Sequence, residues 1–156
     1  KKIINIEMSF TGEYKNLLDQ KNRLSVPAKY RNLLHPTSDQ TFVICKGFDP
    51  CLFLYPIEEW KTVEEQLTSL SSIKNRHRNF VRKIVRHANY VRYDSQGRVA
   101  IPDLLLEYAE IKKEVLVIGM LKKIELWNPD ILKNFEKQKN VLTDEDFDDL
   151  ANEINF

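Results

Sequence analysis

The sequence predicts a mainly β fold with flanking helices (α+β), organised as two similar halves. A nine-residue stretch occurs twice along the chain, over residues 19–27 and 94–102. Each copy is followed by two short apolar runs separated by a turn, and then by a segment with apolar residues at helical spacing. Short apolar runs between turn residues are typical of strands, and a repeat within one chain indicates a duplicated structural unit.

Both copies of the stretch read Asp-x-x-x-Arg, then an alternating apolar run, then Pro. An Asp suits the first position of a turn, because its carboxylate can accept hydrogen bonds from the backbone N–H groups that follow. Asn22 and Gly97 occupy the same place in the two copies, and Asn and Gly tolerate a left-handed backbone best. Residues 19–22 and 94–97 are therefore predicted to form turns that lead into short strands.

The remaining elements follow from apolar periodicity and from the residues that favour turns and helix starts. We expect a strand over 9–18, hairpins over 41–55 and 114–127, a helix over 75–88, and helices that begin at Pro27, Pro56, Pro102, Pro129 and just after Thr143. A half of about fifty residues exposes more apolar sheet than it can cover alone. The two halves are therefore expected to pack against each other, either within one chain or between chains.

Composition indicates a globular protein without a membrane span. The chain has 156 residues, and the 42% that are hydrophobic are enough for a core. No apolar run approaches the ~20 residues that cross a bilayer, and residues 1–7 lack a signal-peptide cleavage site, so we expect a cytoplasmic protein. The two cysteines, Cys45 and Cys51, have no metal-binding spacing and are expected to be reduced core residues. No cofactor is expected.

The formal net charge of +1 hides two regions of opposite charge. Residues 74–92 contain seven basic residues and no acid, whereas residues 143–156 contain six acids and no base. Arg78, Arg82 and Arg86 fall on one face of the helix predicted over 75–88. They are candidates for a second basic surface, which either binds phosphate or pairs with acids of a neighbouring subunit.

The doubled Asp-x-x-x-Arg stretch resembles the MraZ family of bacterial regulators. The resemblance covers Phe10 to Phe135 and includes Gly12-Glu13-Tyr14, residues 49–56 with Trp60, and Glu125-Leu126-Trp127. It implies two tandem AbrB-like swapped-hairpin β-barrel halves, assembled into multi-subunit rings. It also implies a nucleoid-associated transcription factor that binds double-stranded promoter DNA of the division and cell-wall gene cluster at short direct repeats, as an activator or a repressor.

This resemblance divides the chain into four parts. Residues 8–60 would form the first AbrB-like repeat, 61–86 a helical connection, 87–135 the second repeat, and 136–156 an acidic C-terminal tail. The DNA-facing motif of the family falls on Asp19 with Arg23 and on Asp94 with Arg98.

Arginine suits DNA recognition because its planar fork can bond a phosphate or the O6/N7 edge of guanine with two parallel hydrogen bonds. We therefore expect Arg23 and Arg98 to contact DNA. Lys21 adds a cation in the first copy, where the second copy has Gln96, so the two halves are expected to contribute unequally.

A carboxylate that faces phosphate is repelled. Asp19 and Asp94 are therefore expected to orient the arginines rather than to touch DNA, with Asn22 and Gly97 giving the turns their shape. The alternative is that each Asp and Arg form a salt bridge that only stabilises a turn. Repetition of the motif, with Asn or Gly at the same place in both copies, favours the DNA-binding interpretation.

Two other classes of function are weighed against this one. An AbrB-like antitoxin or protein-interaction module would need a segment that folds on its partner, and the acidic tail is the segment that qualifies. An enzyme is not expected, because the sequence has no recognisable Ser/His/Asp set, no glycine-rich phosphate loop and no metal-ligand spacing. No small-molecule ligand is evident either.

Overall fold

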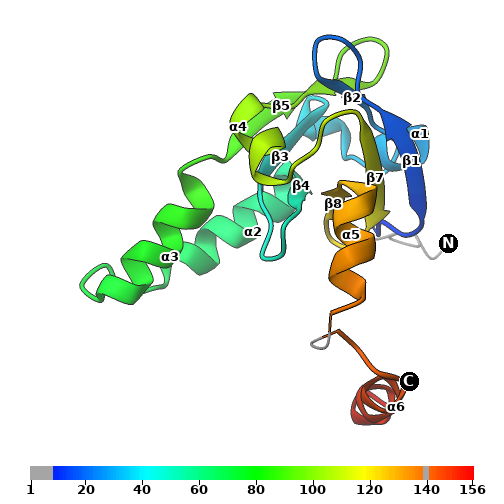
Figure 1. Cartoon of the computed structure of the whole chain (residues 1–156). Coiled ribbons are helices and arrows are strands. Elements are labelled where there is room, and N and C mark those ends of the chain that lie inside the picture. Colours follow the sequence, from blue (N-terminus) through cyan, green and yellow to red (C-terminus); the bar gives the residue numbers. More distant parts are fainter. Residues whose placement is uncertain (1–8, 139–140) are drawn as a thin grey trace, which may run out of the picture.

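Short apolar segments form two antiparallel sheets in the computed structural model, which describes residues 9–138 and 141–156 (Figure 1). Within these residues the strands are β1 (Glu13–Leu17), β2 (Arg23–Ser25), β3 (Thr41–Lys46), β4 (Leu52–Pro56), β5 (Asn89–Arg92), β6 (Arg98–Ala100), β7 (Glu114–Gly119) and β8 (Ile124–Trp127). The helices are α1 (Ala28–Arg31), α2 (Ile57–Thr68), α3 (Asn75–Val85), α4 (Asp103–Tyr108), α5 (Pro129–Glu136) and α6 (Asp144–Glu153), with a 3-10 turn over Pro36–Ser38.

The two halves of the sequence exchange strands. The larger sheet has the order β1-β7-β8-β4-β3-β5, so the first strand of each half lies beside the hairpin of the other half. The hairpins meet through β4 and β8, and the motif strands β2 and β6 form a separate two-stranded sheet. The halves therefore pack against each other within one chain.

The prediction of a mainly β fold with flanking helices is confirmed, and the exchange of strands agrees with the swapped hairpins that the resemblance implies. The large sheet, however, is not closed into a barrel. Strands from both halves share one six-stranded sheet, and β1 and β5 are its two edges. A hairpin alone has too little apolar surface to be stable. Each hairpin gains neighbours from the other half instead of curling onto itself, and the sheet stays open.

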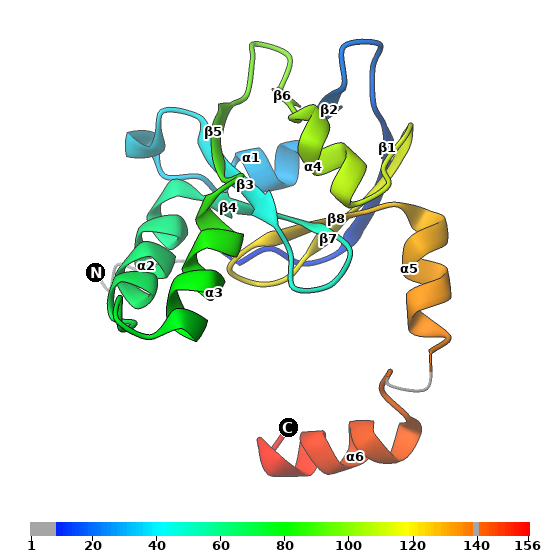
Figure 2. The same ribbon diagram turned by 60° about the vertical axis from the view of Figure 1, so that its left-hand side comes forward.

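The central strands are buried on both faces. On β3 the side chains of Phe42 and Ile44 enter one core cluster, whereas Val43 and Cys45 enter another on the opposite face, as strand alternation requires. The first cluster lies between the large sheet, the β2–β6 pair and α4, and the second lies under α2, α3 and α5 (Figure 2). The sheet is therefore the middle layer of the molecule.

The helix starts differ slightly from those predicted. Pro27 and Pro102 keep extended ψ values of 137° and 140°, so each caps its helix, which begins one residue later. The predicted start of α5 is confirmed, because the Asn128 side chain accepts a hydrogen bond from the Asp130 N–H. Thr143 and Asp146 form a capping box at the start of α6, and α6 stands apart from the rest of the chain in both views (Figures 1 and 2).

The cysteine prediction is confirmed. Cys45 and Cys51 are free thiols that are at most 1% exposed, and burial raises the pKa of Cys45 to about 12. Both thiols therefore stay protonated and unreactive at neutral pH. Among the residues that the structure describes, no helix is long and apolar enough to cross a membrane.

Candidate nucleic-acid interface

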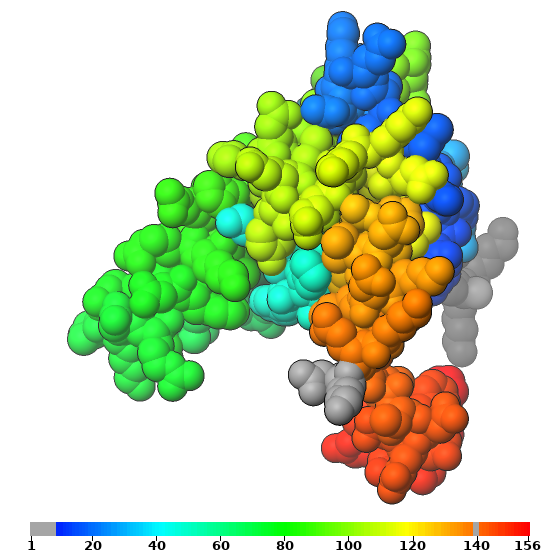
Figure 3. Space-filling model, viewed as in Figure 1, coloured from blue at the N-terminus to red at the C-terminus, as the bar shows by residue number. Residues whose placement is uncertain are grey.

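The two Asp-x-x-x-Arg turns project side by side from one end of the molecule (Figures 1 and 3). Pairing of β2 with β6 brings them together, with Leu24 opposite Val99 at the centre of the ladder. Both of these side chains are fully buried, so the short ladder is anchored in the core. Residues 75 positions apart in the sequence thus meet at one projecting edge.

The carboxylate of Asp19 holds the first turn closed. Its Oδ1 atom accepts hydrogen bonds from the backbone N–H groups of Lys21 and Arg23, each at 2.9 Å. The Asn22 N–H donates to the Asp19 carbonyl oxygen at 3.0 Å, and Asn22 has the predicted left-handed φ of 56°. The turn is therefore fixed by three hydrogen bonds to one aspartate.

The second turn repeats this geometry. Oδ1 of Asp94 accepts from the Gln96 N–H at 2.9 Å and from the Arg98 N–H at 3.0 Å. Gly97 donates to the Asp94 carbonyl oxygen at 2.9 Å and has φ of 77°. The predicted turns and their left-handed residues are confirmed in both copies.

The four charged side chains of the motifs form one Asp–Arg cluster, made of Asp19, Arg23, Asp94 and Arg98. Within each motif the arginine Nε donates to the aspartate Oδ2, at 2.7 Å in the first copy and 3.0 Å in the second. The motifs are also linked, since Nη1 of Arg23 lies 3.8 Å from Asp94 Oδ2 and Nη1 of Arg98 lies 3.6 Å from Asp19 Oδ2. The pairs within each motif agree with the sequence-based expectation, whereas the links between the motifs were not predicted.

This cluster leaves part of each arginine available to a ligand. The arginine side chains are 29% and 25% exposed, and within the described residues no hydrogen bond or ion pair involves Nη2 of either. The hydrogen bonds from the Arg23 and Arg98 backbone N–H groups are the main cause that lowers the pKa of Asp19 and of Asp94. The carboxylates therefore stay charged at neutral pH and hold both guanidinium planes in a fixed direction.

Two further residues, which the sequence did not predict, support the turns. Arg31 donates from Nε to the Val26 carbonyl oxygen at 2.9 Å, and a Cβ on Gly97 would lie 2.5 Å from its guanidinium carbon. Asp103 accepts a 3.3 Å hydrogen bond from the Asn22 side chain. Both residues break the internal repeat, which has Leu106 and Ala28 at the matching positions. A charged residue in one copy, where the other copy has an apolar residue, was the signal in the sequence that could have identified them.

The comparisons with known proteins agree with the repeat. A family model described as "MraZ protein, putative antitoxin-like" matches residues 9–83 and 84–153. The chain belongs to the MraZ family. One relative, the transcriptional regulator MraZ of Pediococcus pentosaceus, is 40% identical over 145 residues, which cover 93% of this chain and 96% of the relative. The protein of the same name from Halothermothrix orenii is 45% identical over 76% of this chain and 80% of its own length.

The MraZ family match includes both charged regions outside the turns. The basic helix α3 runs across the junction of the two matched segments, and the acidic helix α6 lies at the end of the second. On α3, Arg78 donates from Nη1 to the Ser72 and Ile73 carbonyl oxygens, and Arg82 donates to Asn79. The basic surface thus lies on a different side of the molecule from the turns (Figure 1).

Proposed function

We propose that this chain is a sequence-specific DNA-binding transcriptional regulator that contacts promoter DNA with its paired Asp-x-x-x-Arg turns. The observation that carries the proposal is the Asp–Arg cluster at the projecting edge, where two arginine forks are held in fixed directions and remain partly exposed. The names of the relatives, transcriptional regulator MraZ, point to the same class of function.

The residues of the turns have distinct parts in this proposal. Arg23 and Arg98 contact DNA, with the exposed Lys21 as an additional cation beside the first turn. The cluster itself has two cations and two anions, so it adds no net charge that attracts DNA. Its part in binding is to hold the two guanidinium groups in fixed directions. Fixed guanidinium forks fit base edges or phosphates with two hydrogen bonds, which is the geometry that sequence-specific binding needs.

The wider setting is also part of the proposal. The DNA is the promoter of the division and cell-wall gene cluster, and the protein binds tandem short direct repeats there as a multi-subunit ring in the nucleoid. Two turns give weak affinity, but later contacts in one oligomer occur at high effective concentration. Such an oligomer, with evenly spaced turns, suits evenly spaced DNA repeats.

A salt titration of DNA binding tests the proposal. Binding to a promoter fragment with tandem repeats is measured by fluorescence anisotropy for the wild type, Arg23→Ala and Arg98→Ala. Each substitution is expected to weaken binding by about 10- to 100-fold, and wild-type affinity should fall steeply with salt because phosphate contacts release counterions.

Two controls make this result specific. Arg23→Lys keeps the charge but loses the planar fork, so it should bind the repeats less tightly while it keeps most of the non-specific affinity. Lys133→Ala removes an exposed cation from α5, outside the turns, and should bind like the wild type. Wild-type binding by both arginine-to-alanine variants, with folding unchanged, would contradict the proposal.

Arg82 of α3 and Arg86, which follows directly after the helix, are proposed as a secondary phosphate-binding surface. Arg78 is less available, because its guanidinium already donates to two backbone carbonyl oxygens. The double variant Arg82→Ala/Arg86→Ala should lower the affinity for DNA of any sequence and leave the preference for repeats unchanged. An unchanged non-specific affinity would remove this surface from the proposal.

An antitoxin or protein-interaction module is the second candidate function. Helix α6 favours it, because Phe147, Leu150 and Ile154 are between 50% and 70% exposed and would suit a protein partner. A stable complex with a different protein in native extracts, together with absence of promoter binding, would make this the better proposal.

A further inference from the structure

Helix α6 has an apolar side that its own chain leaves uncovered. Phe147 is 58% exposed, Leu150 50% and Ile154 70%, and these side chains line one side of the helix together with Ala151. A helix of ten residues is marginal in water without a packing partner, and its capping box secures only the first turn. An exposed apolar side of this kind indicates a binding surface.

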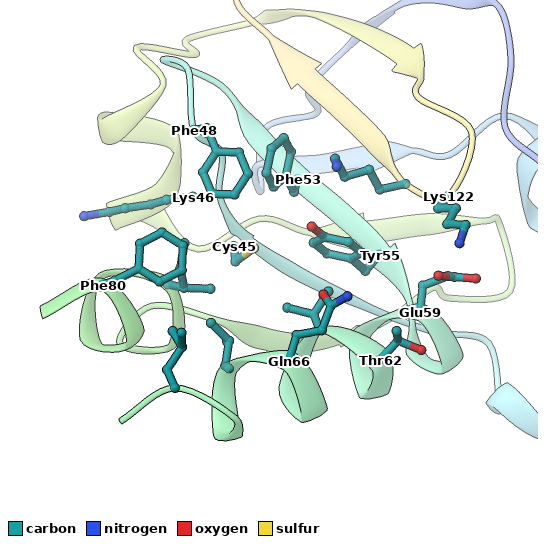
Figure 4. A pocket seen from close by; sticks show the side chains of 15 residues that line it. Cys45, Lys46, Phe48, Phe53, Tyr55, Glu59, Thr62, Gln66, Phe80 and Lys122 are labelled. Atoms are coloured by element: carbon teal, nitrogen blue, oxygen red, sulfur yellow. The ribbon is translucent and has the colours of Figure 1, made fainter. Parts of the chain in front are cut away.

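A groove of matching character lies between the large sheet, α2 and α3. It has a volume of about 440 Å3, and its floor is made by Phe53 and Tyr55 of β4 with Val63 and Leu67 of α2. Figure 4 shows Phe48 and Phe80 toward one end of this groove and Glu59 with Lys122 toward the other.

Two of the aromatic side chains at the groove are poorly covered. Phe48 is 67% exposed and Phe80 is 44% exposed. Their rings stack at 6.4 Å between centroids, and Phe48 also packs against Phe53 edge to face at 5.4 Å. These contacts hold the two exposed rings in fixed positions at the mouth of the groove, where they offer apolar area to a ligand.

The charges of helix and groove are complementary. Residues 143–156 contain six acids and no base. The groove is lined by Lys46, Lys122 and Lys123 and by one acid, Glu59. Lys123 lies 4.7 Å above the Phe53 ring, so the cation sits directly over the apolar floor. Lys46 also borders the neighbouring basic surface of α3. An apolar helix side flanked by acids fits an apolar groove flanked by lysines.

We propose that α6 of one copy binds the groove between α2, α3 and the sheet of a second copy of this chain. Within one chain α6 lies apart from α2 and α3 in both views (Figures 1 and 2), so its own groove is left open. Each copy then offers one helix and one groove, which makes a head-to-tail contact that can repeat from copy to copy. The inference rests on the self-assembly part of the proposed function and is independent of DNA reading by the turns.

Photo-crosslinking between isotopically distinct copies tests this contact in the full chain without DNA. A photoreactive residue replaces Leu150, and 15N-labelled protein is mixed with unlabelled protein before illumination. Mass spectrometry should find peptides from α6 of one isotope joined to groove peptides of the other, such as those with Phe80 or Leu67. Crosslinks only within single chains, or only to other surfaces, would overturn the proposal.

Sedimentation of substituted full-length chains gives the second readout. Phe147→Ser/Leu150→Ser should weaken self-association by at least about 100-fold, because two apolar side chains lose their buried site, and the body should stay folded because it makes no use of them. Asn152→Ser lies on the other side of α6 by helical spacing and should assemble like the wild type. Unchanged assembly of the double variant would overturn the proposal.

The groove side is tested in the same way. Lys122→Glu/Lys123→Glu reverses the charge beside the groove and should weaken assembly, most strongly at low salt. Lys112→Glu/Lys113→Glu makes the same change in charge at exposed positions outside the groove and should assemble normally. Equal effects of the two pairs would contradict a specific role of the groove. Because DNA is absent from these measurements, failure of DNA binding and failure of this contact are seen separately.

Discussion

At the scale of single residues, the carboxylates of Asp19 and Asp94 each have two structural roles. Oδ1 closes the turn through backbone N–H groups, and Oδ2 holds Nε of the arginine four positions later. The ion pairs between the motifs also fix the two arginines relative to each other. In the proposed function, each arginine is thereby held in direction before DNA arrives, which reduces the entropy lost on binding.

The variant Asp19→Asn separates orientation from simple charge. Removal of a carboxylate near phosphates would strengthen DNA binding if charge alone mattered. We expect binding to weaken by roughly two- to tenfold instead, because the charged acceptor of the Arg23 fork is lost. Anisotropy measurements at fixed salt check this, and tighter binding by the variant would contradict the orienting role.

The same variant has a defined pH dependence. The pKa of Asp19 is lowered from its ordinary value of 3.8 in the folded chain, so the ionised carboxylate stabilises the fold above that pH and the stabilisation is lost as pH falls below it. The difference in unfolding free energy between wild type and Asp19→Asn should be constant from neutral pH to about pH 5 and should shrink below pH 3.8. A difference that stays constant to the lowest pH would contradict this.

At the scale of elements, local signals predicted the turns, hairpins and helices well. Asn22 and Gly97 marked the left-handed positions, and the hairpin turn after Lys46 and the Asn128 cap were readable from residue types. The first helix begins one residue after Pro27, where the sequence predicts its start, because residue types do not distinguish a cap with extended ψ from a first helical residue.

The cap of α5 provides a test at this scale. Asn128 accepts from the Asp130 N–H and donates from Nδ2 to the Glu110 carbonyl oxygen. Asn128→Ala should destabilise the fold by about 1 kcal/mol, measured by chemical denaturation. Asn134→Ala, at an exposed position within the same helix, should be nearly neutral, and equal effects of the two variants would contradict the capping role.

At the scale of the whole molecule, the family resemblance implied swapped hairpins, but local sequence pattern alone did not predict the exchange of strands. Apolar alternation identifies strands but does not say which strands pair, because the partners of β1 and β5 lie in the other half of the sequence. The Asp–Arg cluster depends on the same long-range pairing, since only β2 beside β6 brings Arg23 near Asp94. The repeat predicted two similar turns that contribute unequally, and the pairing of β2 with β6 joins them into one cluster.

This exchange predicts how a cut chain behaves. A specific protease site inserted within residues 69–73, between α2 and α3, allows the halves to be separated covalently after folding. The fragments should stay together in gel filtration under native conditions and separate only in denaturant, because β1 with β7, β3 with β5 and β4 with β8 cross between them. Fragments that separate without denaturant would contradict the shared sheet.

We propose that DNA lies on the two projecting turns, and site-specific crosslinking to DNA tests this placement. A photoreactive residue is placed at Gln20 or Gln96 in the turns, at Asn79 on α3, or at Asn134 on α5, all of them exposed positions. We predict crosslinks to a repeat-bearing promoter fragment from Gln20 and Gln96 and none from Asn134. The placement would be contradicted if only the Asn79 variant crosslinked to DNA, while the Gln20 and Gln96 variants bound DNA without crosslinking to it.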